Sequence, residues 1–121
     1  MENIADIKTE MAVGTRWRVA DVQGKTDHII EVVEVCKTWF FFVYPEFEGY
    51  TEDELYLGFV PPRIEPCLWP QRDGIRDVII DDAKTFTLTL FGKPISRYTK
   101  LDYKSDKKFI KCLPNGIPVF E

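Results

Sequence analysis

Between residues 39 and 44 the chain places five aromatic side chains in six positions, and this run constrains the fold more than any other feature. Successive side chains of a β-strand point to opposite faces, so a strand with this sequence presents aromatic rings on both faces of its sheet. Such a strand must be covered on both sides, or one face must be covered by a ligand or a partner. The run therefore favours a binding protein over an enzyme.

The length of 121 residues corresponds to one domain. With 45% apolar and 30% charged residues, the chain can bury a core without metals or disulfides. No apolar run approaches the roughly 20 residues needed to cross a bilayer, so no membrane partner is expected. Cys36, Cys67 and Cys112 have neither disulfide nor zinc spacing, which predicts reduced thiols in a cytoplasmic protein, with Cys67 the most accessible.

Alternating patterns predict a mainly β fold with at most one or two short helices. From Thr85 to Leu90, threonines alternate with apolar residues, which indicates a half-buried strand. Asn115-Gly116 lies between two apolar runs, and this dipeptide is typical of a tight hairpin. Counting such segments gives about seven or eight strands, which predicts a single small β-barrel or β-sandwich domain.

The predicted domain covers residues 13–121, and residues 1–12 are either a tail or a short amphipathic helix. Four prolines fall within residues 61–74, and because proline lacks a backbone donor, this segment cannot be a helix interior or a central strand. We expect it to be a rigid crossover that Trp69 attaches to the body. Thr51 and Glu54 fit a capping box, which predicts a helical turn over residues 52–57.

Residues 32–59 run from one strand through the aromatic strand and an acidic turn to a short strand. In this form the first half of the chain resembles the small five-stranded barrels of the SH3-like and Tudor-like group. The resemblance implies an aromatic cage beside acids that binds methylated or otherwise cationic side chains. The residues that could form such a cage are Trp17, Trp39, Tyr44, Phe47, Tyr50, Glu48 and Glu52.

The first functional hypothesis is a non-catalytic intracellular binding protein or inhibitor that engages a protein partner with its aromatic and acidic segment, residues 39–54. The candidate partner-binding residues are Trp39, Tyr44, Phe47, Glu48, Tyr50 and Glu52. The alternative for the aromatic run is structural. In that case Trp39, Phe41 and Val43 belong to the core, and the rings of opposite parity pack on the proline-rich segment.

The second hypothesis uses the basic end of the chain, since residues 93–121 hold seven bases and three acids. Bases interleaved with aromatic residues are typical of sites for nucleotides or single-stranded nucleic acid. The candidate anion-binding residues are Arg97, Tyr98, Lys100, Lys104, Lys107 and Lys108. A protein of this kind would sequester its ligand, as phage-encoded sponges and inhibitors do. The acidic total, with a pI near 5.1, argues against a dedicated nucleic-acid binder, and a solvated lysine-rich turn explains the bases equally well.

Catalysis has little support in the sequence. His28 is the only histidine, so a nucleophilic triad or a histidine-rich metal site is not expected, and no glycine-rich phosphate loop is present. We therefore expect no enzyme activity, no metal and no cofactor. A small carboxylate-dependent hydrolase using a pair such as Asp81 and Asp82 is the remaining alternative, although these residues are also simple turn formers.

The uneven charge also bears on self-association. Acids gather around residues 46–54 and bases around residues 93–111, and two such patches could meet twice across a two-fold axis. Exposed ion pairs contribute only about 0–1 kcal/mol each, so the aromatic residues 39–50 would have to form the apolar centre of the interface. On this basis a homodimer is a further hypothesis.

Overall fold

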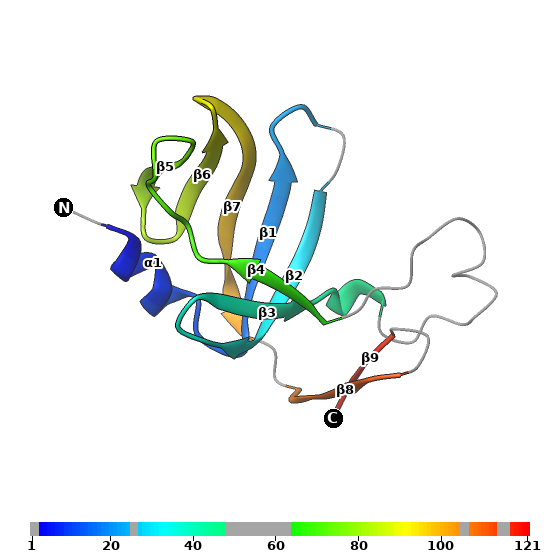
Figure 1. Cartoon of the computed structure of the whole chain (residues 1–121). Coiled ribbons are helices and arrows are strands. Elements are labelled where there is room, and N and C mark those ends of the chain that lie inside the picture. The colour runs from blue at the N-terminus through cyan, green and yellow to red at the C-terminus, as the bar shows by residue number, and fades with distance from the viewer. Residues whose placement is uncertain (1–2, 25–26, 48–63, 105–106, 114–116) are drawn as a thin grey trace.

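Short β-strands make up most of the computed structural model, which describes residues 3–24, 27–47, 64–104, 107–113 and 117–121. The predicted mainly β fold is confirmed, and the described residues contain one short α-helix (Figure 1). Within the described residues, no helix is long and apolar enough to cross a membrane. The elements are α1 (Ile4–Glu10), β1 (Thr15–Asp21), β2 (Asp27–Val35), β3 (Trp39–Val43), the 3-10 turn η1 (Pro45–Phe47), β4 (Glu65–Leu68), β5 (Arg76–Asp82), β6 (Thr85–Leu90), β7 (Lys93–Lys104), β8 (Phe109–Cys112) and β9 (Pro118–Phe120).

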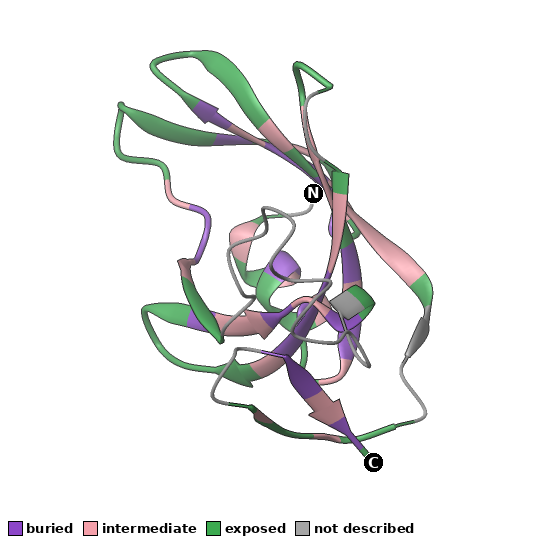
Figure 2. Cartoon of the chain, turned by 90° about the vertical axis from the view of Figure 1, so that its right-hand side faces the viewer, coloured by how far each residue is buried: buried purple, intermediate pink, exposed green. Residues whose placement is uncertain are grey.

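Seven of the strands form one antiparallel sheet in the order β4-β3-β2-β1-β7-β6-β5. The sheet curls into a half-barrel, with β4 and β5 as its two edges (Figure 1). β8 and β9 form a separate two-stranded hairpin. Burial follows this arrangement: the hairpin ends of β5, β6 and β7 are largely exposed, whereas buried residues concentrate along the middle of the sheet (Figure 2).

The pairing register decides which side chains lie on the concave face, because residues directly opposite each other on neighbouring strands point to the same face. Val19 on β1 lies opposite His28 on β2 and Tyr98 on β7. Two residues further along β1, Asp21 lies opposite Ser96. These five side chains therefore share the concave face near one end of the strands.

The helix covers the other end of the concave face. The side chain of Asn3 caps its N-terminus in a capping box with Asp6. The helix then buries Ile7 and Met11 completely, in one core cluster with Trp17 of β1. Of the two alternatives for residues 1–12, a tail or a short amphipathic helix, the structure has the helix, whose apolar side supplies core side chains.

A cation of the large sheet contacts the β8–β9 hairpin. Within the hairpin, Phe120 of β9 packs edge-on against Phe109 of β8. The guanidinium of Arg16 on β1 lies 5.8 Å from the centre of the Phe120 ring. Arg16 also forms an ion pair of 2.8 Å with Glu31, whose side chain is buried. The predicted hairpin strands are confirmed, and the turn at residues 114–116 lies outside the described residues.

The prediction that Trp39, Phe41 and Val43 form the core is wrong for Trp39. Its side chain is 43% exposed and Phe41 is half-buried, while Phe40 and Val43 are buried. The physical reason is that Trp69 covers the face of β3 on which Phe40 lies, whereas Trp39 lies on the other face, at the first residue of the strand. Phe40 packs on Trp69 with ring centres 4.9 Å apart, so the rings of opposite parity do meet the proline-rich segment.

The proline-rich segment contains one more strand than the sequence predicts. β4 includes Pro66 and pairs with β3, which proline permits because β4 is an edge strand. Trp69 is buried and its Nε1 donates a hydrogen bond of 2.8 Å to the Cys36 carbonyl, so its predicted attachment to the body is confirmed. The helical turn predicted at residues 52–57 lies outside the described residues.

The predicted order of thiol accessibility is wrong. Cys36 is the exposed cysteine, whereas Cys67 and Cys112 are half-buried. Cys67 lies directly opposite Phe40 on β3, so its side chain points to the concave face rather than outward.

Candidate functional site

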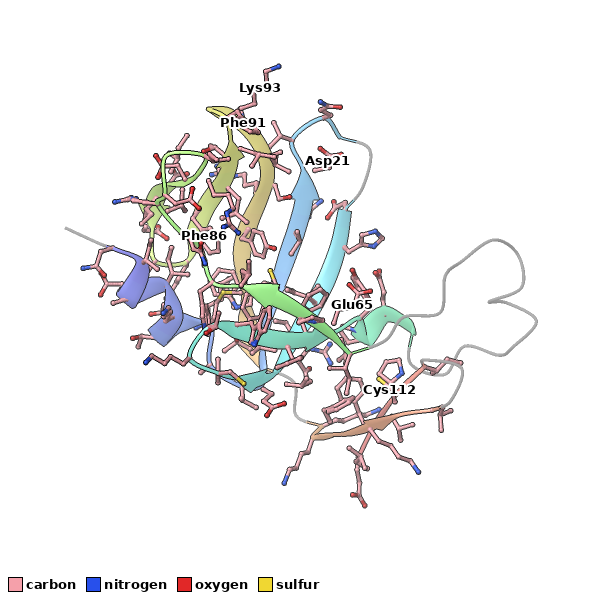
Figure 3. All side chains as sticks on the ribbon, in the orientation of Figure 1. Asp21, Glu65, Phe86, Phe91, Lys93 and Cys112 are labelled. Atoms are coloured by element: carbon pink, nitrogen blue, oxygen red, sulfur yellow. The ribbon has the colours of Figure 1, made fainter. Side chains whose placement is uncertain are left out.

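A hollow of about 220 Å³ opens on the concave face, at the end that the helix does not cover. It lies between the first three strands and β7, and we call it the polar hollow. Asp21, at the end of β1, lines the hollow, and Glu65 lies at the start of β4. Both side chains are labelled in Figure 3. The residues that line the hollow are Val19, Asp21, His28, Ile30, Phe42, Tyr44, Ser96 and Tyr98.

Aromatic rings form most of its walls. Phe42 and Tyr44 pack edge to face with ring centres 5.5 Å apart, and His28 packs on Tyr44 at 5.6 Å. On the opposite side, Tyr98 stacks almost parallel on Phe86 with ring centres 4.9 Å apart. These contacts fix the rings in place, so the walls are already formed before any ligand enters.

Carboxylates surround the rings. Asp21 lines the hollow directly, and an oxygen of Glu46 lies 3.1 Å from Nδ1 of His28. Glu65 lies opposite Phe42 across the β3–β4 pair, so its side chain shares the concave face. Burial raises the pKa of Tyr44, and the negative charges of Glu65 and Glu46 raise that pKa further. The phenol of Tyr44 therefore lies in a negative potential.

Behind the hollow, the Tyr98 hydroxyl lies 3.9 Å from the Cys67 sulfur. Burial is the main reason that the pKa of both groups is raised. The hydrogen bond between them lowers the pKa of Cys67 and so partly offsets the effect of burial on that thiol. Both groups are therefore neutral near pH 7. A thiol with a raised pKa is a poor nucleophile, so this pair favours binding over covalent chemistry.

The structure brings one predicted partner-binding residue, Tyr44, to the polar hollow. Trp39 lies elsewhere, exposed at the start of β3, and Trp17 is fully buried in the core. The side chains of Phe47, Glu48, Tyr50 and Glu52 lie outside the described residues.

The predicted anion-binding residues are separated. Arg97 pairs with Asp81 at 2.6 Å, on the face opposite to its neighbour Tyr98, and Lys100 pairs with Glu10 of the helix at 2.6 Å. Lys107 and Lys108 are exposed before β8, and the side chain of Lys104 lies outside the described residues. Arg97 and Lys100 are therefore each engaged in a separate ion pair.

The carboxylates considered for hydrolysis have structural partners. Asp81 binds Arg97, and Asp82 accepts a hydrogen bond of 2.7 Å from the backbone of Lys84 in the β5–β6 turn. Among the residues that the structure describes, no group of three or more metal-ligating side chains is present.

Sequence reasoning missed Asp21, Ser96 and Glu65 as members of the site. One signal was available for Asp21, because it continues the alternation of Trp17 and Val19 along β1. Ser96 and Glu65 join the site only through the register of β7 and β4, which alternation cannot supply.

Comparisons of the chain with protein-family models, with curated proteins and with solved structures found no match.

Proposed function

We propose that the protein is a non-catalytic binding protein that accepts a cationic group of a protein partner in the polar hollow. The observation that supports this most directly is the composition of the site. Its described lining combines aromatic rings with Asp21 and contains no lysine or arginine. Aromatic faces attract cations through their quadrupole, by about 0.5–2 kcal/mol depending on how far the cation is desolvated.

The size of the hollow supports a side chain as the occupant. Sites for whole drug-sized molecules span roughly 300–1,000 Å³, and this hollow has about 220 Å³. One ammonium or guanidinium head group with its last methylene groups is a better match. The rest of such a ligand would lie outside, on the rim of the half-barrel.

Asp21, in the lining, and Glu65, on the same face of the sheet, have no arginine or lysine partner in the described residues. Elsewhere on the sheet acids are paired, as in the Arg18–Asp27 and Arg97–Asp81 ion pairs. An incoming cation would supply the missing countercharge. We propose the cytosol as the compartment, since the three cysteines are unpaired and thiols stay reduced there.

Calorimetric titration with short glycine-flanked peptides tests the proposal. Peptides with one lysine or one arginine should bind with a saturable signal, and peptides with norleucine or citrulline at the same position should not. Asp21→Asn should weaken binding by about tenfold, which is typical of a partly desolvated charge contact.

Asp82→Asn is a matched control. Both aspartates accept a hydrogen bond from the backbone N–H two residues ahead, and asparagine can keep that bond in either place. The control should bind the peptides as the unmodified protein does. Equal binding of the lysine and norleucine peptides would refute the proposal.

A further inference from the structure

A second hollow, of about 430 Å³, lies between the β4 edge of the half-barrel and the strands at its other edge. We call it the apolar hollow. The segment from Pro66 to Gln71 forms one side, and residues 76–77 of β5 with residues 88–89 of β6 form the other. The hollow thus occupies the seam that a fully closed barrel would not have.

Its walls are mainly apolar. Leu68, Trp69 and Leu88 line it, together with the exposed ring of Trp39. The indole N–H of Trp69 already donates a hydrogen bond to the Cys36 carbonyl. The indole can therefore make only apolar contacts with a ligand in the hollow. A tilted contact with Phe40 holds the Trp69 ring in place, which gives the seam a rigid aromatic floor.

The two charged residues that line the hollow, Arg76 and Asp77, each have an ion-pair partner. Arg76 pairs with Asp73 at 3.1 Å, and Arg72 pairs with Asp77 at 3.2 Å. An ionic ligand would compete with these pairs and would lose its own hydration on entering. A neutral ligand has neither cost, so the site favours an uncharged molecule.

Polar side chains also line the hollow, and one of them is Gln71. The Gln71 amide lines the hollow and makes no hydrogen bond with the described part of the chain. An amide can donate to and accept from a single polar group of a ligand, while the apolar walls cover the rest.

From these observations we propose that the apolar hollow is a binding site for a neutral small molecule built on a planar aromatic ring system with one hydrogen-bonding group. The volume of about 430 Å³ lies within the roughly 300–1,000 Å³ of typical small-molecule sites, in contrast to the polar hollow. The site is independent of the cation-binding function, because the two hollows share no lining residue.

A matched pair of fluorescent probes tests this proposal. N-phenyl-naphthylamine is neutral and aromatic and has one N–H group, and anilinonaphthalene sulfonate is the same ring system with a negative charge. The neutral probe should bind at one saturable site, at least about tenfold more tightly than the charged probe, because of the desolvation cost of the charge.

Variants locate the site. Trp39→Ala should weaken binding of the neutral probe about tenfold, since it removes an aromatic contact and its apolar area. Gln71→Trp should fill the mouth and block binding. Phe91→Ala is the control, because Phe91 is also an exposed aromatic residue, at 73%, and lies at the β6–β7 turn outside the hollow.

Three outcomes would overturn the proposal. One is the absence of saturable binding by the neutral probe. The second is equal or tighter binding of the charged probe. The third is a loss in Phe91→Ala as large as that in Trp39→Ala, which would indicate nonspecific binding to exposed apolar surface. Circular dichroism of each variant verifies that the loss does not come from unfolding.

Discussion

At one end of the concave face, Ile7 and Met11 of the helix pack into the same core cluster as Trp17, and all three side chains are fully buried. At the other end the same strands carry Asp21 and Tyr44, and a hollow remains. The two ends differ because the open end contains the carboxylate of Asp21, which needs polar partners. Aliphatic side chains that covered the carboxylate of Asp21 would remove it from water without replacing its hydrogen bonds. The free energy lost in this way exceeds the free energy gained by burying the aliphatic groups. One end therefore stabilises the fold, and the other retains the hollow that we propose accepts a ligand.

The largest expected difference between the two ends is in how much their side chains contribute to the free energy of unfolding. Trp17→Ala removes a fully buried ring that packs on Phe86, so the free energy of unfolding should fall by about 3–5 kcal/mol. Tyr44→Ala, at the half-buried open end, should cost less than half as much. Urea denaturation measures both. Equal losses would contradict the division into a filled end and an open end.

An intermediate effect is expected at alkaline pH. The raised pKa of Tyr98 means that the folded state favours the neutral phenol, so stability is complete below the ordinary pKa of 10.0 and declines as pH rises above it. Cys67, with an ordinary pKa of 9.0 that burial raises, adds a loss of the same sign that begins earlier. Thermal unfolding followed between about pH 8 and pH 11 should show a falling melting temperature.

Tyr98→Phe removes the contribution of the phenol, so its melting temperature should fall less steeply over the same range. Cys36→Ser, which replaces an exposed thiol, is the control and should follow the unmodified protein. A steeper fall in Tyr98→Phe would show that the buried phenol is not responsible.

The smallest effect is expected for the ion pair that fastens the helix. The hydrogen bond from Lys100 lowers the pKa of Glu10, so this contribution is present above the ordinary pKa of 4.5 and is lost as pH falls through the lowered value. Glu10→Gln should reduce the free energy of unfolding near pH 7 by about 0.2–1 kcal/mol. The difference from the unmodified protein should vanish at acid pH. A difference that persists there would indicate lost packing instead of lost charge.

How far the sequence predicts the fold depends on whether one face of a segment is polar. The alternation in Thr85–Leu90 identified β6, because its threonines and apolar residues separate cleanly. In β3 both faces are apolar, so alternation could not say whether Trp39 or Phe40 is buried; pairing with β4 and contact with Trp69 decided it. β4 was missed because Pro66 excludes a central strand but not an edge strand.

The candidate site was less predictable than the fold. Tyr44 was identified because aromatic residues beside acids suggest a cation site, whereas Ser96 and Glu65 reach it through long-range strand pairing. The homodimer remains a prediction. Phe40 and Val43 are buried within the protomer, so they are not available for the apolar centre that such an interface needs.

The most direct test of the central claim, that the open end of the concave face holds a cation, is a nuclear magnetic resonance titration of the isotope-labelled protein with choline. Its neutral carbon analogue, dimethylbutanol, is titrated in parallel. We predict saturable shifts centred on Asp21, His28, Tyr44 and Tyr98 with choline, and affinity at least about tenfold lower for the neutral analogue. Asp21→Asn should weaken the choline response. Shifts of equal size with both probes, or choline shifts centred away from these residues, would contradict the account.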